Sequence, residues 1–172
     1  MSPIVEFALV FLMMVAIILP FTTFIHELGH ALTAAVLLKQ PVDIILGMEE
    51  KTRSIRVGRM ITIKLQPLSG WVGFFRYSHE KPMKKMTFIL IMLSGPLFSL
   101  LLAISSYLFV SNVDIPPIVN KVIILIMNAA FIQCAITIIP VKYPSLMGAY
   151  SGVRSDGYQV VSCLCSKKGV SE

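Results

Sequence analysis

The chain has 172 residues, of which 56% are hydrophobic and 14% are charged, and its mean hydropathy is +0.81. A soluble domain of this size needs a more polar surface, so the composition excludes the soluble classes and indicates an integral membrane protein. The net charge of +6 does not indicate a nucleic-acid partner, because the basic residues cluster beside apolar segments. There they act as topology signals and contact anionic lipid headgroups.

The first apolar segment covers residues 3–38, and its only charged residues are Glu6 and Glu27. A bilayer core needs roughly 20 helical residues, so this segment is longer than one simple span. We expect a tilt, or a break at Pro20, to accommodate the excess.

The C-terminal half of this segment contains His26-Glu27-Leu28-Gly29-His30, which matches His-Glu-x-x-His. On a helix the two histidines point to one face, which is the spacing that holds one zinc ion. Glu27 is then placed to activate a metal-bound water. A glutamate within a span costs roughly 2.5–3.5 kcal/mol if it is as costly as aspartate, so it indicates a functional site. The alternative is a buried polar network between helices.

The region 39–82 changes character and predicts a small sheet at the membrane surface. Its expected strands are Val42 to Leu46, Ser54 to Val57, Met60 to Gln66 and Trp71 to Tyr77. An exposed edge, at Ile61 to Gln66 or at Trp71 to Tyr77, is suited to hold an unwound peptide by main-chain hydrogen bonds.

Two further apolar segments predict membrane helices at about 86–110 and 118–140. The second segment contains Ser94-Gly95-Pro96, which favours a kink or a close helix contact. The third contains Asn128, for which an interhelical hydrogen bond is favoured over a role in stabilising charge on a substrate carbonyl. An Asp-Gly loop and short helix follow at about 141–166, in which Cys163 and Cys165 are interpreted as packing residues.

The basic residues predict the topology. Ten of the fifteen Lys and Arg lie in residues 39–85, and residues 112–120 contain none. With three spans, the positive-inside rule places the N-terminus outside and the C-terminus in the cytoplasm. The end of the first segment and the end of the third then face the same side, where His26, His30 and Asp156 can meet.

A catalytic zinc typically has three protein ligands and one open position for water. The residues that could in principle add the third ligand are His79, Asp43, Glu49, Glu50, Glu80 and Asp156. Asp156 is favoured because it follows the third span directly and precedes Gly157, which lets the backbone turn closely beside a buried site. The alternative for Asp156 is a role in capping a helix, since Ser155-Asp156-Gly157 opens an apolar run.

The pattern resembles the site-2 protease family of intramembrane zinc metalloproteases over nearly the whole chain. The resemblance lies in the His-Glu-x-x-His motif, in Ser94-Gly95-Pro96, and in Ile139-Pro140 followed by Ser155-Asp156-Gly157. It implies three core helices with a small sheet after the first, one Zn²⁺ held by His26, His30 and Asp156, and Glu27 as general base.

The chain departs from the family pattern at three places. Thr137 and Ser99 stand where family members often have asparagine, and Val141 to Ser155 separates the proline from the Asp-Gly pair. The residue that stabilises the substrate carbonyl therefore stays open between Asn128, Thr137 and another group.

We therefore expect one domain over 1–172, mainly helical, which acts as an intramembrane zinc endopeptidase on membrane-embedded or membrane-proximal peptides. The alternatives are a non-enzymatic metal-binding scaffold, an inactive relative that binds membrane peptides, and a small metal transporter. We expect a multi-pass protein of a bacterial cell membrane whose partners are a peptide substrate and the lipid bilayer.

Overall fold

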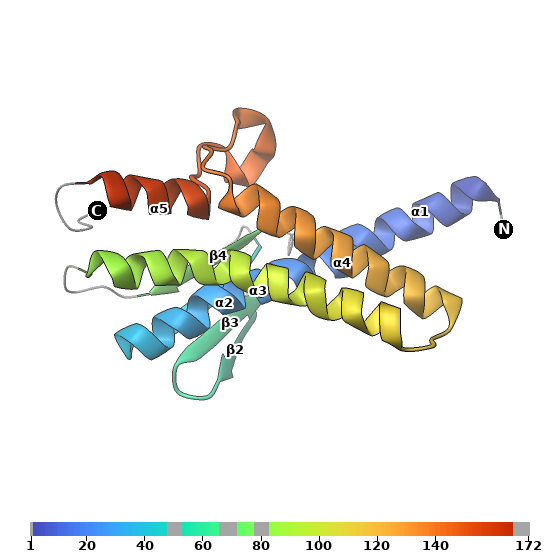
Figure 1. Cartoon of the computed structure of the whole chain (residues 1–172), viewed down its shortest axis with the longest axis horizontal. Helices are drawn as coiled ribbons and strands as arrows, with labels where there is room; N and C mark the ends of the chain where they lie inside the picture. Colours follow the sequence, from blue (N-terminus) through green and yellow to red (C-terminus); the bar gives the residue numbers. More distant parts are fainter. Residues whose placement is uncertain (1, 48–52, 66–71, 78–82, 167–172) are drawn as a thin grey trace.

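The computed structural model describes residues 2–47, 53–65, 72–77 and 83–166, and it is mainly helical, with a small sheet between the first two long helices (Figure 1). The helical elements are α1 (Pro3–Met13), the π-helical η1 (Met14–Ile18), α2 (Leu19–Leu38), α3 (Lys85–Asn112), α4 (Pro117–Ile138), the 3₁₀ element η2 (Ser145–Tyr150) and α5 (Asp156–Cys165). The strands are β1 (Val42–Leu46), β2 (Arg53–Val57), β3 (Ile61–Leu65) and β4 (Gly73–Tyr77). The predicted fold class is confirmed.

The first long helix runs from Pro3 to Leu38 and contains a π-helical turn directly before Pro20. Within this turn the Leu19 N–H donates to the Met14 carbonyl, five residues back. Proline has no N–H and its ring crowds the carbonyl four residues before it, so a wider turn accommodates it without ending the helix. The helix ends where Lys39 adopts a left-handed conformation (φ 53°), and Pro41 follows.

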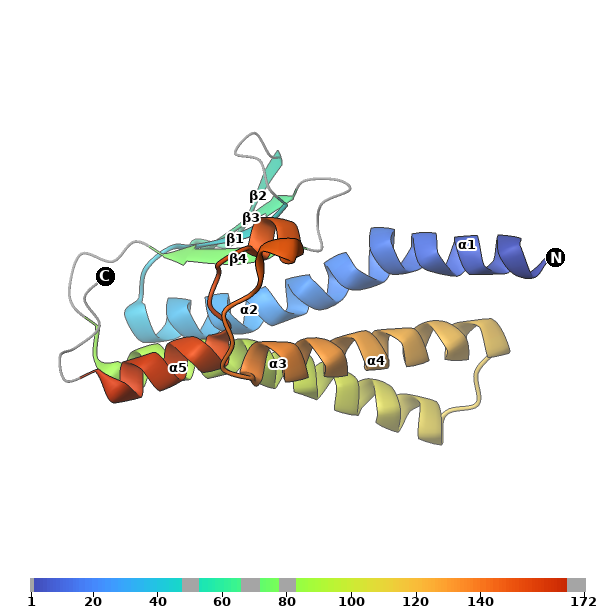
Figure 2. The ribbon, with the colours of Figure 1, turned by 90° about the horizontal axis from the view of Figure 1, so that it is seen from above.

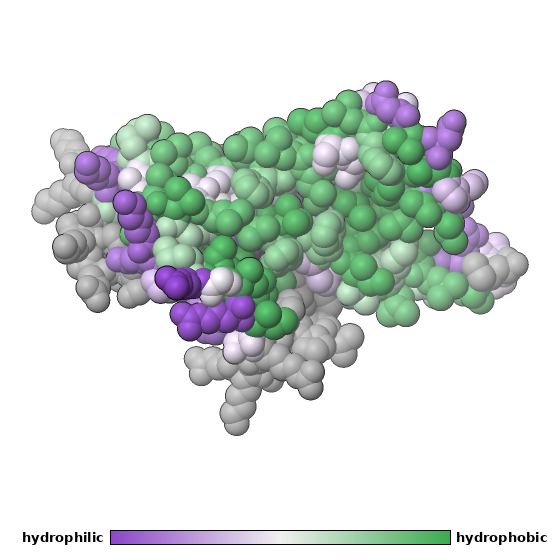
Figure 3. Space-filling model, turned by 90° about the horizontal axis from the view of Figure 1, so that it is seen from below, coloured by the Kyte–Doolittle hydropathy of each residue, from purple (hydrophilic) through white to green (hydrophobic). Residues whose placement is uncertain are grey.

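Three helices are long and apolar enough to cross a membrane: Pro3–Leu38, Lys85–Asn112 and Pro117–Ile138. Large apolar side chains project outward from all three, among them Phe7, Leu97 and Ile118, which are 72%, 51% and 73% exposed. On the face drawn in Figure 3, apolar side chains cover the middle, and hydrophilic ones gather toward the two ends and near the sheet. Such a surface suits lipid rather than water, and the chain is a multi-pass membrane protein.

The sheet has the strand order β2-β3-β1-β4 and lies beside α2, on the side away from α3 and α4 (Figure 2). β1 pairs parallel with β3 and antiparallel with β4, and β2 and β3 form an antiparallel hairpin. The β3 segment therefore lies inside the sheet, and the expectation that Ile61 to Gln66 presents an exposed edge is wrong for Ile61 to Leu65, while Gln66 lies outside the described residues. Among the described strands, β2 and β4 lie at the edges.

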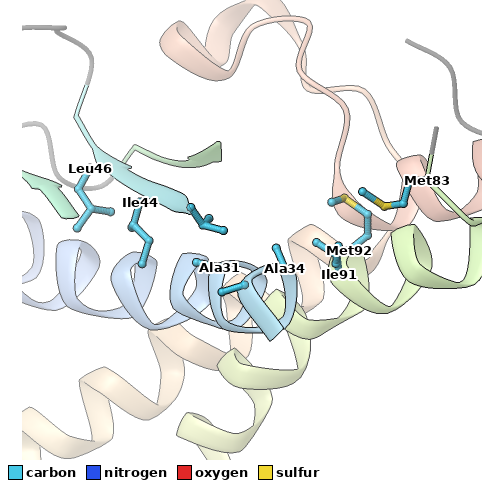
Figure 4. Packing of buried hydrophobic residues seen from close by; sticks show 9 residues of the cluster. Ala31, Ala34, Ile44, Leu46, Met83, Ile91 and Met92 are labelled. Carbon is cyan, nitrogen blue, oxygen red and sulfur yellow. The ribbon is translucent and has the colours of Figure 1, made fainter. Parts of the chain in front are cut away.

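The sheet and the helices share one apolar core, centred on α2 (Figure 4). The alternating side chains of β1 pack against small residues of α2, and α3 contributes Ile91 and Met92 from the other side. The buried members of this cluster are Ala31, Ala34, Ala35, Val42, Ile44, Leu46, Met83, Ile91 and Met92. The core thus fixes α2 between β1 and α3, which positions the motif that α2 carries.

The connection from α4 to α5 leaves the bundle, contacts the sheet and returns (Figure 2). α4 ends at Ile138, since Pro140 cannot continue a helix. Lys142 and Arg154 form a β-bridge, and the Ser155 N–H donates to the Val141 carbonyl at 3.0 Å. The segment between them is therefore an excursion closed at its base, which returns the chain to the end of α4.

Candidate metal centre

Three buried side chains from opposite ends of the chain converge on one point: His26 and His30 from α2, and Asp156 at the first residue of α5. Their ligand-type atoms form a small triangle. The Asp156 Oδ2 lies 3.1 Å from the His26 Nε2 and 3.5 Å from the His30 Nε2. The two Nε2 atoms are 3.2 Å apart. The predicted group is thus brought together across 130 residues of sequence between His26 and Asp156.

The dimensions of this triangle fit a zinc ion. Zinc–ligand bonds of about 2.0 Å in tetrahedral geometry place the ligand atoms about 3.3 Å from one another. The observed separations of 3.1, 3.2 and 3.5 Å bracket that value. The donor set of two imidazoles and one carboxylate is also one that catalytic zinc sites use, with a fourth position open to water.

Hydrogen bonds at the far side of each imidazole orient its Nε2 toward the centre. The His30 Nδ1 lies 2.6 Å from the Ile91 carbonyl, which only accepts, so in the neutral ring Nδ1 carries the proton and Nε2 the lone pair. The His26 Nδ1 lies 3.0 Å from the Ser99 hydroxyl, which is able to accept the Nδ1 proton in the same way. Partners of this kind fix the tautomer and the ring orientation of metal-binding histidines.

Asp156 is placed by the residue before it. The buried Ser155 caps α5 by accepting from the Tyr158 N–H at 3.1 Å, and its hydroxyl donates to the Ile139 carbonyl at 2.7 Å. Ser155 therefore provides the helix cap, and Asp156 occupies the first turn, where the helix dipole favours an anion.

The ionisation of Asp156 also suits a ligand. Burial disfavours its charged form, but when the two imidazoles are protonated, their hydrogen bonds and positive charge favour that form more strongly and lower its pKa to about 2. The side chain is therefore an anion at neutral pH, which metal binding requires.

Glycines allow the supporting elements to approach the ligands. A Cβ on Gly95 of α3 would lie 2.1 Å from the His30 Nε2, so the helix backbone is in direct contact with this ring. A Cβ on Gly29 would lie 2.6 Å from the Ser94 carbonyl oxygen, and one on Gly157 would lie 1.9 Å from the Ile138 carbonyl oxygen. The expected close approach at Gly157 is confirmed, whereas the contact of Gly95 with a metal-binding candidate was not foreseen.

Glu27 lies beside the triangle and lines a cavity of about 690 Å³ together with His26, His30 and Asp156. The β4 strand passes directly over it, because a Cβ on Gly73 would lie 2.9 Å from the Glu27 Oε1. Phe75 of the same strand stacks on His30, with ring centroids 4.8 Å apart. The sheet therefore forms one wall of the site.

The connection between α4 and α5 closes another side of the cavity. The Tyr150 hydroxyl accepts a hydrogen bond from the Gly73 N–H at 2.8 Å, and its ring contacts Phe74 and Tyr143. Burial raises the pKa of Tyr150, so this hydroxyl is neutral. Sequence reasoning missed Tyr150, because only the folded excursion brings it to the strand.

The other candidate ligands do not join the group among the described residues. Asp43 pairs with Lys64 of the neighbouring strand at 2.7 Å. The remaining alternatives, His79, Glu49, Glu50 and Glu80, lie outside the residues that the structure describes.

The two candidates for carbonyl stabilisation both line the cavity but differ in their contacts. The Thr137 hydroxyl donates to the Gln133 and Cys134 carbonyls of its own helix, at 2.9 and 3.3 Å. Asn128 is exposed, and within the described part of the chain its side chain has no hydrogen bond, so the favoured interhelical bond is not observed.

The candidate site lies within a region of the sequence that matches a known protein family. The sequence model of peptidase family M50 matches residues 13–163, a range that contains both histidines, Glu27 and Asp156. No curated protein matches the chain.

Proposed function

Since the chain belongs to peptidase family M50, the site-2 protease family, we propose that it is an intramembrane zinc endopeptidase that cleaves membrane-embedded or membrane-proximal peptides. The observation that supports this most strongly is the buried triangle of His26, His30 and Asp156, whose edges match those of a tetrahedral zinc site. In this proposal these residues hold one Zn²⁺, and Glu27 is the general base.

A zinc ion held there would lower the pKa of a bound water and polarise the scissile carbonyl. The residues of the chain perform the remaining tasks. Glu27, 7% exposed, takes the proton of the attacking water and passes it to the leaving amine. Ser99 and the Ile91 carbonyl keep the two imidazoles in the required orientation. The site lies among apolar helices, which limit its contact with bulk water.

We further propose that the N-terminus lies outside and that the C-terminus faces the cytoplasm. One end of the helix bundle contains the C-terminus of the first long helix, the N-terminus of α3 and the C-terminus of α4, and most of the Lys and Arg residues are near this end. The connection between α3 and α4 lies at the opposite end of the bundle and contains no Lys or Arg. The positive-inside rule assigns the basic end to the cytoplasm.

The β4 strand is the proposed docking edge for the substrate. In an antiparallel pair, successive residues of a strand alternately point their N–H and C=O groups toward and away from the partner strand. The Val72 carbonyl points toward β1, because it accepts a hydrogen bond from the Gly47 N–H. The N–H and C=O groups of Gly73 and Phe75 therefore point away from β1, toward the open edge of the sheet. An unwound peptide that adds to this edge would lie beside Glu27 and His30, which contact the same two residues. The Tyr150 hydroxyl occupies the Gly73 donor, so a substrate strand that uses this donor must displace it.

Replacing Tyr150 tests the docking edge. Tyr150→Phe keeps the ring but frees the Gly73 N–H, so we expect KM for a membrane peptide to fall about fivefold, the equivalent of one modest hydrogen bond. Steady-state cleavage kinetics in vesicles measure this. The exposed Tyr107→Phe on α3 is the matched control and should leave KM unchanged. An unchanged KM in Tyr150→Phe would rule out strand addition at Gly73.

Metal removal tests the function itself. We expect purified protein in vesicles to cleave an apolar transmembrane peptide, to lose the activity when a chelator removes the metal, and to regain it with one equivalent of zinc. Mass spectrometry of the peptide identifies the products, and elemental analysis counts the zinc. Stoichiometric zinc without cleavage of any of a panel of membrane peptides would favour the metal-binding scaffold instead.

A further inference from the structure

One polar side chain in the cavity is not explained by the folded chain alone. Gln133 of α4 lines the cavity that contains Glu27 and the metal-binding candidates. Its amide oxygen Oε1 is fully buried, and it has no hydrogen-bond partner within the described part of the structure. A buried amide oxygen without a partner is destabilising, so such a group calls for an explanation.

Three other polar side chains that line the cavity differ from Gln133, and the first of them, Asn128 of α4, also has no hydrogen bond within the described residues but is exposed. The Thr137 hydroxyl, one turn after Gln133, donates to main-chain carbonyls of its own helix. The Gln159 amide donates to the Arg154 carbonyl at 3.4 Å. Gln133 thus combines a place in the cavity with an unused buried acceptor.

The occupant of the cavity indicates what this amide meets. An extended peptide has hydrogen-bonding groups along both of its edges, and each one left unpaired is costly in a membrane. The β4 edge can satisfy one side of such a peptide, through Gly73 and Phe75. The other side then needs donors and acceptors from another element that lines the same cavity, and α4 carries Gln133 there.

We propose that Gln133 binds the main chain of the substrate peptide on the edge opposite β4. A carboxamide offers one acceptor and two donors, so it can accept a peptide N–H and donate to a peptide carbonyl at the same time. The inference rests on the proposed peptidase function, because it assumes that an unwound peptide enters the cavity. It adds a substrate-binding residue outside the metal-binding group.

Peptide binding in the absence of turnover tests this inference. In a Glu27→Gln background, a labelled leucine-rich transmembrane peptide is titrated against protein in lipid vesicles. We expect Gln133→Leu to raise Kd about tenfold, since one buried hydrogen-bonded pair is lost. We also expect an unchanged or higher Tm, because the substitution removes an amide oxygen that has no partner in the free protein.

Two comparisons isolate the main-chain contact. Gln40→Leu makes the same substitution at another buried amide oxygen that has no partner among the described residues but is not part of the cavity lining, and it should leave Kd unchanged. In a second series, the peptide carries a single N-methyl group at each backbone position in turn, which removes one N–H donor. At one position the methyl group should abolish the difference in Kd between Gln133→Leu and its parent protein.

The outcomes separate the two proposals. An unchanged Kd in Gln133→Leu, or a raised Kd accompanied by a lower Tm, would overturn the role of Gln133 while cleavage by the wild-type chain still upheld the peptidase. A wild-type chain that neither binds nor cleaves membrane peptides would overturn both.

Discussion

Glu27→Gln is expected to abolish peptide cleavage while the protein keeps its zinc. The amide has nearly the same shape as the carboxylate but cannot take a proton from water. Loss of a general base typically costs about 10²–10⁴ in rate, and we expect the upper part of that range because Glu27 is the acidic side chain next to the His26–His30–Asp156 group. Single-turnover cleavage in vesicles, with zinc counted in the same samples, measures both effects.

A control distinguishes loss of chemistry from loss of structure. Glu6→Gln makes the same change in the same long helix, at a residue that is exposed and far along the sequence from the motif. It should cleave like the wild type. Cleavage by Glu27→Gln at the wild-type rate would rule out the proposed mechanism, and loss of zinc together with activity would show that Glu27 supports the metal site instead of acting as the base.

The helices and the existence of the sheet could be predicted because they depend on local pattern. Long apolar runs can satisfy their main-chain groups in a membrane only as helices, and the predicted spans match the observed ones within two residues at each end. The π-helical turn before Pro20 and the ends at Lys39 and Ile138 follow from the same backbone chemistry. The four strands were also found: β1 has the predicted ends, β2 and β3 each begin one residue away from the prediction, and the predicted ends at Gln66 and Trp71 lie outside the described residues.

The order of the strands was not predictable in the same way. The strands β2 and β3 form a hairpin, and their sequences do not indicate which of the two pairs with β1. Pairing between distant segments depends on packing against α2, which no local pattern reports. For this reason the prediction of an exposed edge was wrong for Ile61 to Leu65. Of the two strands predicted to bind an unwound peptide, only β4 lies at an edge of the sheet.

The convergence of the candidate metal-binding group was predictable where spacing and topology act together. His26 and His30 share a helix face by their spacing, and the distribution of basic residues placed Asp156 at the same end of the bundle. The residues that orient them were not found, because Ser99 reaches His26 across 73 residues of sequence and acts only once α2 packs on α3. The long connection after Pro140 departs from the family pattern, but the β-bridge between Lys142 and Arg154 closes it at its base, so Asp156 still returns to the end of α4.

Gly95→Ala is expected to empty the proposed metal site of an otherwise folded protein. The sequence suggested a kink or a close helix contact at Ser94-Gly95-Pro96, and the structure shows a contact with His30: the added methyl group would lie 2.1 Å from the His30 Nε2 and 2.5 Å from its Cε1. The His30 ring cannot simply tilt away, because its Nδ1 is hydrogen-bonded to the carbonyl of Ile91, which lies on α3 like Gly95. Either His30 leaves the triangle, which removes a ligand of the proposed ion, or α3 moves, which breaks the hydrogen bonds from Ile91 and Ser99 that orient the two imidazoles.

Zinc content and cleavage should therefore fall together in Gly95→Ala. We expect zinc affinity to fall about 100-fold or more if one of three ligands is lost, because a change in a residue that only supports a ligand already lowers metal affinity by about 10–100-fold. Leu97→Ala, two residues later and 51% exposed toward the proposed lipid phase, is the control and should keep both. Circular dichroism should show an unchanged helix content in the two variants. If Gly95→Ala bound zinc as tightly as the wild type, the contact between α3 and His30 would not define the site, and the proposed triangle would have to be abandoned.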